Sequence, residues 1–164
     1  MARRSIRSPL ESGFPPTLRV AEIVDLVRAH FAEPAPTGEI LERFGLTLIA
    51  RRQAGGLSGG ERRRLAVALA FAGRPRALLL DEPTAGLDVE TRRAVWQEVR
   101  SYADEGGTVL LTTHDLDEAE ALASRIVVLA RGAVVAEGSA AGLAELARAS
   151  GLEDAYIALT EGGQ

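Results

Sequence analysis

The apolar run at residues 77–80 constrains the fold most strongly, because no polar side chain interrupts it. A short continuous run of this kind is typical of a strand that is buried on both faces of a parallel sheet. Parallel neighbours need long crossover connections, which are usually helices. Helical spacing at residues 89–102 and a second expected strand at 108–113, with apolar residues at 109–111, meet that requirement. The sequence therefore predicts an α/β fold built around a parallel sheet.

The remaining periodicity divides the chain into four expected regions. They are a tail at 1–13, a helical region at 14–76, an α/β core at 77–140 and a helical tail at 141–164. The helical region contains expected helices at 18–31, 39–44 and 58–72. The core adds a helix at 116–123 and strands at 126–130 and 134–136, and the tail begins with a helix at 141–149. The helix at 58–72 is almost wholly apolar in its second half, which predicts that it is buried.

Composition excludes several classes of protein. Hydrophobic residues make up 46% of the 164 residues, which is enough for one globular domain with a core. The net charge of −4 argues against bulk electrostatic binding of nucleic acid. The absence of cysteine excludes disulfides and thiolate metal sites, and the apolar runs are too short to span a bilayer. All nineteen basic residues are arginine.

Two carboxylates and a proline, Asp81, Glu82 and Pro83, end the first predicted strand. Ligands of parallel sheets gather beyond the carboxyl ends of the strands, which makes both acids candidate site residues. Neighbours in an extended chain point to opposite sides, so one acid could face a metal while the other faces a water molecule. Pro83 holds Glu82 away from helical conformations and ends the strand. The alternative interpretation is an ordinary acidic turn after a core strand.

The segment Leu57-Ser58-Gly59-Gly60-Glu61 also has two interpretations. In the first, Ser58 caps the helix and Glu61 reaches back to its free amide, which is a capping box. In the second, the exposed amides and the helix dipole bind a phosphate. The two interpretations are compatible. His114, after the second predicted strand, is either a structural histidine or a group that bonds a phosphate oxygen.

The motifs LSGGE at 57–61, ALLLDEPTAGLD at 77–88 and LLTTH at 110–114, in that order, resemble the nucleotide-binding domain of ABC transporters. The resemblance implies an ATPase with a P-loop core of ABC type, a helical subdomain and ATP and Mg²⁺ as cofactors. It implies that Asp81 holds Mg²⁺ through water, that Glu82 orients the attacking water, and that His114 contacts the γ-phosphate. Asp88 then belongs to the D-loop, and Leu57, Ser58, Gly59, Gly60 and Glu61 form the signature motif.

The resemblance extends from about residue 14 to the end of the chain. The segment at 14–22 is similar to the one that opens the helical subdomain, which contacts the membrane partner in this family. The segment at 132–138 is similar to the family's late hairpin, and 152–156 to the tail of its drug-resistance exporters. The implied partners are a transmembrane permease and a second nucleotide-binding domain in a head-to-tail dimer, with no nucleic acid. The implied location is cytoplasmic, at the inner face of the cell membrane.

Two family features do not occur in the sequence. The Walker A pattern G-x-x-x-x-G-K-[ST] is absent, and there is no lysine to replace its ammonium group. Leu10 stands where the Q-loop glutamine is expected. In cores of this type the Walker A strand lies between the strands expected here at 108–113 and 126–130. Without this central strand, we expect either two open edges or a re-paired sheet.

Three hypotheses follow from these motifs. The chain is an N-terminally truncated ATP-hydrolysing subunit of an ABC exporter, or it is a non-hydrolysing partner that lends its signature motif to an intact ATPase. The third hypothesis is a soluble ABC ATPase that acts in DNA repair or translation. The short helical subdomain, the exporter-like tail and the lack of a basic patch argue against the third.

Overall fold

A computed structural model describes residues 6–7 and 13–161 of the chain. The chain divides into two compact units, Met1–Thr112 and Thr113–Gln164, and each is considered by itself. In the described part of the chain, none of the helices combines the length and the apolar character needed to cross a membrane. Leu10, where the family glutamine is expected, lies outside the described residues.

The first unit begins with two short helices, α1 (Val20–Arg28) and α2 (Thr37–Arg43). Helix α1 buries Val20, Ile23 and Val24 on one face, as the helical spacing predicts. It ends three residues earlier than expected, because the amide of Phe31 bonds the carbonyl of Arg28 in a tighter turn. Helix α2 begins directly after Pro36, two residues before the helix that the sequence predicts. Pro36 fixes the entry to α2, since its ring presets the backbone for a helix start.

Two 3-10 turns, η1 (Thr47–Ile49) and η2 (Ala54–Gly56), lead into helix α3 (Gly59–Phe71). Residues 65–71 of α3 are all buried, so the prediction of a buried helix is confirmed. Helix α4 (Val89–Asp104) is amphipathic instead, with Val95 and Val99 as its buried residues. Helix α3 packs against the first long strand of the sheet and α4 against the second.

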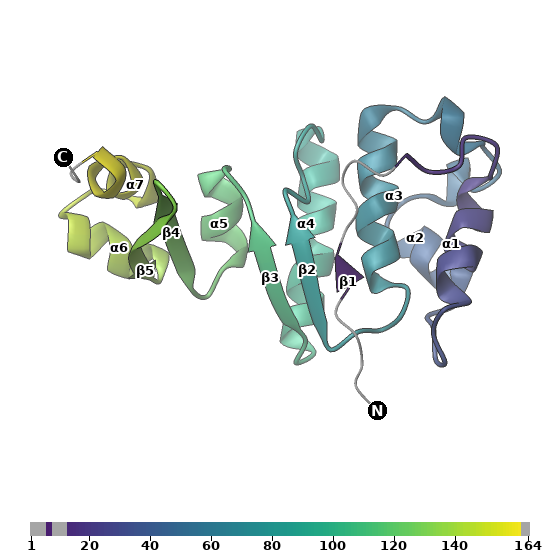
Figure 1. The fold of residues 1–164 in the computed structure, drawn as a ribbon, viewed down its shortest axis with the longest axis horizontal. Helices are drawn as coiled ribbons and strands as arrows, with labels where there is room; N and C mark the ends of the chain where they lie inside the picture. Colours follow the sequence, from purple (N-terminus) through teal and green to yellow (C-terminus); the bar gives the residue numbers. More distant parts are fainter. Residues whose placement is uncertain (1–5, 8–12, 162–164) are drawn as a thin grey trace. The chain divides into compact units, whose positions relative to one another are not determined.

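The sheet of the first unit contains β1 (Ile6–Arg7), β2 (Ala77–Asp81) and β3 (Thr108–Thr112) in the order β1-β2-β3 (Figure 1). Both pairings are parallel, and Ala77 of β2 pairs with Thr108 of β3. The predicted α/β fold with a parallel sheet is therefore confirmed.

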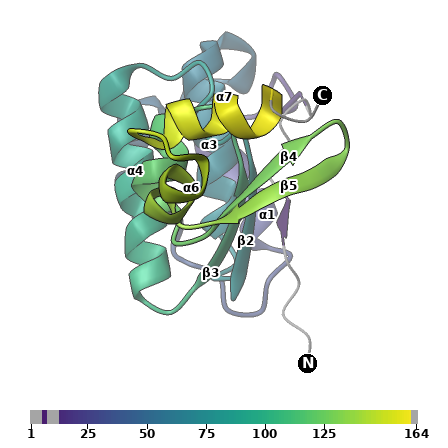
Figure 2. The ribbon, with the colours of Figure 1, turned by 90° about the vertical axis from the view of Figure 1, so that its left-hand side faces the viewer.

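The expectation that the first apolar run is buried on both faces is wrong. Leu78 and Leu80 are buried, with 0% and 2% of their surface exposed, whereas Ala77 and Leu79 are only half-buried. The buried pair points to the helices, and Figure 2 shows α4 along one side of β2 and β3. An unbroken apolar sequence does not reveal that only one face of the strand is covered.

The second unit holds α5 (Leu116–Leu122), β4 (Ile126–Ala130), β5 (Ala133–Gly138), α6 (Ala140–Ala147) and α7 (Leu152–Glu161). Strands β4 and β5 form an antiparallel hairpin (Figure 2). A small core joins Ala119, Val128, Ala136, Leu143 and Leu152 from all five elements. Among the described residues β4 pairs only with β5.

Candidate functional site

The amino-terminal end of α3 is closed by the capping box that the sequence predicts. The Ser58 Oγ accepts a hydrogen bond from the Glu61 amide at 3.2 Å, and the Glu61 carboxylate accepts one from the Ser58 amide at 2.8 Å. Arg52 adds an ion pair to Glu61 at 2.7 Å and donates to the carbonyl of Gly56. These donors, above all the Ser58 N–H, hold the pKa of Glu61 below its usual range. The signature segment is therefore a rigid helix start.

The two glycines after Ser58 differ in their surroundings. A Cβ atom on Gly59 would meet no atom within 4 Å. A Cβ on Gly60 would lie 3.5 Å from the Leu87 side chain and 4.0 Å from the carbonyl oxygen of Gly86. Leu87 is buried, so the signature helix packs directly on the turn that carries the D-loop motif. The structure thus brings together two motifs that are about 25 residues apart in the sequence.

The carboxyl end of β2 carries the two acids. Asp81 is the last residue of the strand, is exposed, and accepts a hydrogen bond from the Thr112 hydroxyl at the end of β3. The Glu82 amide donates to the Thr112 carbonyl at 2.9 Å. Thr112 therefore bonds the carboxylate of Asp81 through its hydroxyl and the backbone of Glu82 through its carbonyl. The sequence analysis missed it, although a threonine that ends the neighbouring parallel strand was a usable signal.

Glu82 corrects one expectation about this end of the strand. We expected an extended backbone that points the two acids to opposite sides, but Glu82 has a φ of 48°, in the left-handed region. The strand ends at Asp81, and the Glu82 carbonyl accepts from the Ala85 amide at 3.3 Å, which closes a turn. Left-handed backbone is costly for a residue with a side chain and clusters at functional sites. The turn thus sets the backbone conformation of Glu82.

Asp88 is the N-cap of α4. Its carboxylate accepts from the Thr91 amide at 2.9 Å and from the Thr91 hydroxyl at 2.7 Å. The Thr91 amide is the main reason why the pKa of Asp88 is lowered. His114 belongs to the second unit, where it is exposed and precedes Asp115, the N-cap of α5. Its role stays a prediction from the sequence.

The two caps make the stability of the first unit sensitive to acid. Folding lowers the pKa of Glu61 and of Asp88, so the folded state favours their charged forms. This contribution is fully present above the unfolded pKa values of about 4 and is lost as the pH falls through the lower folded values. We expect the free energy of unfolding to decline below about pH 5. Urea unfolding followed through the fluorescence of Trp96, the single tryptophan, measures it.

Two variants test the assignment of this acid sensitivity to the caps. Glu61→Gln and Asp88→Asn should each give a flatter pH dependence of the unfolding free energy. Asp104→Asn, which changes an exposed carboxyl at the other end of α4, should follow the parent protein. If both cap variants kept the parent slope, the caps would not be its origin.

The site residues fit Mg²⁺ only together with a nucleotide. The described residues contain no group of three or more side chains that could hold a metal ion by themselves. Mg²⁺ in nucleotide sites is typically held by one or two carboxylates, water and substrate phosphates. The exposed carboxylate of Asp81 could supply the carboxylate of such a site. When bound, the ion neutralises charge on the phosphates. The sequence offers no lysine and no Walker A loop to hold those phosphates.

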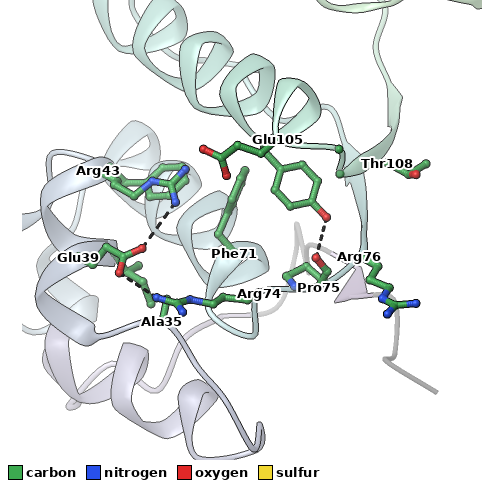
Figure 3. A pocket seen from close by; sticks show the side chains of 14 residues that line it. Ala35, Glu39, Arg43, Phe71, Arg74, Pro75, Arg76, Glu105 and Thr108 are labelled. Atoms are coloured by element: carbon green, nitrogen blue, oxygen red, sulfur yellow. Dashed lines mark hydrogen bonds and ion pairs between the residues drawn. The ribbon is translucent and has the colours of Figure 1, made fainter. Parts of the chain in front are cut away.

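A pocket of about 830 Å³ lies at the other end of the sheet, and the sequence analysis did not predict it (Figure 3). Three segments line it, from α2, from the connection between α3 and β2, and from the end of α4 to the start of β3. The rings of Phe44 and Phe71 are 4.9 Å apart, and Tyr102 follows at 5.6 Å from Phe71. The Tyr102 hydroxyl donates to the Pro75 carbonyl at 2.8 Å, and burial raises the pKa of this tyrosine. Arg43, over the Phe71 ring, forms an ion pair with Glu98 of α4 at 2.8 Å.

Comparison with known proteins agrees with this geometry. A sequence profile of the ABC transporter family matches residues 5–85. Daunorubicin resistance ATP-binding protein DrrA3 of Streptomyces coeruleorubidus is 46% identical over 130 residues, 79% of this chain and 40% of the relative. The solved structure of an ATP-binding subunit of an ABC transporter aligns with a TM-score of 0.83 and 23% identity, over 96% of this chain and 68% of its own. A dimeric ATP-binding cassette bound to ADP and Pi in a post-hydrolysis state aligns with a TM-score of 0.74 and 27% identity, over 83% of this chain and 62% of its own.

The motif order, the parallel sheet and these matches place the chain in the ABC transporter family, as a nucleotide-binding domain. Its similarity to a drug-resistance ATP-binding protein agrees with the branch that the tail at 152–156 resembles. The chain spans 40% of the length of that relative.

Proposed function

We propose that the chain is an ATP-binding and ATP-hydrolysing subunit of an ABC-type exporter. The observation that carries the proposal is the carboxyl end of β2, where Asp81 and Glu82 are both hydrogen-bonded to Thr112 of β3. Acids at this end of a parallel sheet lie where ligands of such sheets bind. The name of the Streptomyces relative, a daunorubicin resistance ATP-binding protein, supports a role in drug resistance.

Each site residue then has a role in the reaction of ATP with water. Asp81 holds Mg²⁺ through a water molecule, Glu82 orients the attacking water, and His114 contacts the terminal phosphate. The signature residues, Leu57, Ser58, Gly59, Gly60 and Glu61, act together with Asp88 across a head-to-tail dimer, on a nucleotide held by the second domain. The packing of Gly60 on Gly86 and Leu87 supports a common surface for both motifs. The dimeric cassette with ADP and Pi supports the same assembly.

The pocket of Figure 3 supports contact with a transmembrane partner, at the inner face of the cell membrane. It is lined in part by α2, from the helical region that the resemblance assigns to that contact. Aromatic rings at its base and charged side chains at its rim, such as Arg74 paired with Glu39 at 3.2 Å, suit a peptide segment of mixed polarity. The pocket lies at the ends of β2 and β3 that are remote from Asp81.

A second candidate is a partner subunit that does not hydrolyse ATP itself. The structure supports it because the cap around Ser58 is complete and Gly59 beside it is exposed. Such a chain lends Ser58, Gly59, Gly60 and Asp88 to the nucleotide of an intact ATPase.

Two substitutions distinguish the candidates when the chain is purified with an intact ATP-binding subunit. Ser58→Ala should lower the ATPase rate of the complex about tenfold or more under either candidate, because it removes a group at the shared nucleotide. Glu82→Gln should lower the rate only if this chain hydrolyses ATP. Losses from both changes support the first candidate, a loss from Ser58→Ala alone supports the second, and no loss from either contradicts both.

Loss of a helix cap needs its own control in this experiment, because it destabilises a helix by about 1 kcal/mol. Ser139 offers a matched cap at the start of α6, where its Oγ accepts from the Gly142 amide at 3.1 Å. Ser139→Ala should therefore leave the ATPase rate unchanged while it removes the same kind of hydrogen bond.

A further inference from the structure

Asp81 and Thr112 present their polar groups on the same face of the parallel sheet. The register pairs Asp81 of β2 with Thr112 of β3. Because side chains alternate along a strand, Asp81 points away from the face on which Leu80 is buried, and both members of the pair are exposed. The Thr112 hydroxyl donates a hydrogen bond to Oδ1 of Asp81 across the two strands. The carboxylate at the end of one strand is thus held by a side chain of the neighbouring strand.

This hydrogen bond occupies one of the two oxygens of the Asp81 carboxylate. A threonine hydroxyl has a single proton to donate, and in Thr112 that proton goes to Oδ1. Among the described residues, no group donates to the other oxygen, Oδ2. Carboxylates in magnesium–nucleotide sites act together with water and phosphate oxygens, so one free oxygen is sufficient for a contact through water. The arrangement therefore separates the oxygen that fixes the side chain from the oxygen that is open to a ligand.

We propose that Thr112 is a positioning residue for the magnesium-bound nucleotide: its hydroxyl holds the Asp81 carboxylate in one orientation and leaves Oδ2 for the water that links Asp81 to the ion. This inference rests on the proposed function and adds a residue to the site assigned there. An exposed aspartate otherwise turns about its terminal bond, because that torsion is broad. Binding of the ion would then have to restrict the side chain, which costs conformational entropy.

Thr112 contacts the second acid of the site in a different way. The Glu82 amide donates to the Thr112 carbonyl at 2.9 Å, and this main-chain bond does not involve the Thr112 side chain. A substitution at Thr112 should therefore release the Asp81 carboxylate and keep the backbone of Glu82 in place. We expect a weaker affinity for the metal ion with little change in the rate at saturating metal.

Three substitutions separate the hydroxyl from the rest of the Thr112 side chain. Thr112→Val keeps the branched shape and removes the hydroxyl, Thr112→Ser keeps the hydroxyl, and Thr112→Ala removes it without an added methyl group. Thr108→Val is the matched control, because Thr108 is also exposed and lies at the other end of β3, beside Ala77.

The probe for metal binding is Fe²⁺ in place of Mg²⁺, added with ATP to the chain purified with its transmembrane partner and an intact ATP-binding subunit. With ascorbate and hydrogen peroxide, bound Fe²⁺ cleaves the backbone beside its site, so fragments of this chain report its own site. We expect cleavage near residues 81 and 112. The Fe²⁺ concentration for half-maximal cleavage should rise about tenfold in Thr112→Val and Thr112→Ala, as is typical when a group that orients a metal ligand is removed. It should stay within about twofold of the parent value in Thr112→Ser and Thr108→Val.

The Mg²⁺ dependence of the ATPase rate of the same complex is the second measurement. Thr112→Val should raise the Mg²⁺ concentration for half-maximal rate about tenfold and keep the maximal rate within about twofold. A merely structural role of Thr112 would instead lower the maximal rate and leave the Mg²⁺ requirement unchanged, which would contradict the inference. Urea unfolding followed through Trp96 shows whether each variant is folded, and Thr112→Ala decides the matter if Thr112→Val is not.

Unchanged metal requirements in Thr112→Val and Thr112→Ala would overturn the inference, as would an equal rise in Thr112→Ser. If Asp81→Asn weakens metal binding and the Thr112 variants do not, Asp81 stays in the proposed site and the role of Thr112 alone is contradicted. If the parent protein is not cleaved near residues 81 and 112, the proposed function is contradicted together with this inference.

Discussion

Replacing Asp81 with asparagine is expected to lower the Mg²⁺-dependent ATPase rate of the assembled transporter about 100-fold. The amide side chain of the variant would keep an oxygen that accepts from the Thr112 hydroxyl, so the end of β2 should keep its shape. The substitution removes the negative charge that would hold the magnesium ion in the proposed site. The effect is large because phosphoryl transfer depends on positioning and on stabilisation of charge rather than on covalent chemistry.

The measurement is the ATPase rate at increasing Mg²⁺ concentration, for the chain purified with its transmembrane partner and a second ATP-binding subunit. Asp81→Asn should shift the Mg²⁺ requirement upward as well as lower the maximal rate. Asp104→Asn is the control, since it removes one exposed carboxyl of the first unit at the end of α4. An unchanged Mg²⁺ requirement in Asp81→Asn would contradict the assignment of Asp81 to the metal site.

Replacing Leu78 with alanine is expected to lower the free energy of unfolding of the first unit by about 3 kcal/mol. Leu78 has no exposed surface, and it lies near the middle of β2 with a paired strand on each side. The cost combines the lost burial of the side chain with the cavity that remains, because packed helices and strands cannot collapse fully into it. This is a substantial share of the stability of a small domain.

Urea unfolding followed through Trp96 measures this loss, because that residue lies on α4 in the same unit. Leu110→Ala in the neighbouring strand is the matched control, and it should cost less than about 0.5 kcal/mol because Leu110 is mostly exposed. Comparable losses in the two variants would mean that both faces of the sheet are covered in solution.

The sequence predicted most elements of the fold because their signals are local. The capping box at Ser58 and Glu61 needs four adjacent residues, and the structure shows both of its hydrogen bonds. Helix α7 was not separated from the rest of the predicted helical tail, since its apolar residues gain a partner only in the small core of the second unit. The pocket of Figure 3 was missed because three distant segments form it.

The sequence alone determined the class of the protein, since the order of the three motifs and the apolar runs of the parallel sheet are local patterns, and the residues of the site stay a prediction. Only the tertiary structure decided that Thr112 bonds the Asp81 carboxylate and the Glu82 amide, that Glu82 has a left-handed backbone, and that Gly60 packs on Leu87. It also decided which face of β2 is covered. The physical reason is that an apolar residue in the sequence indicates a tendency to be buried. The residues that bury it come from a distant part of the chain, which the local sequence does not identify.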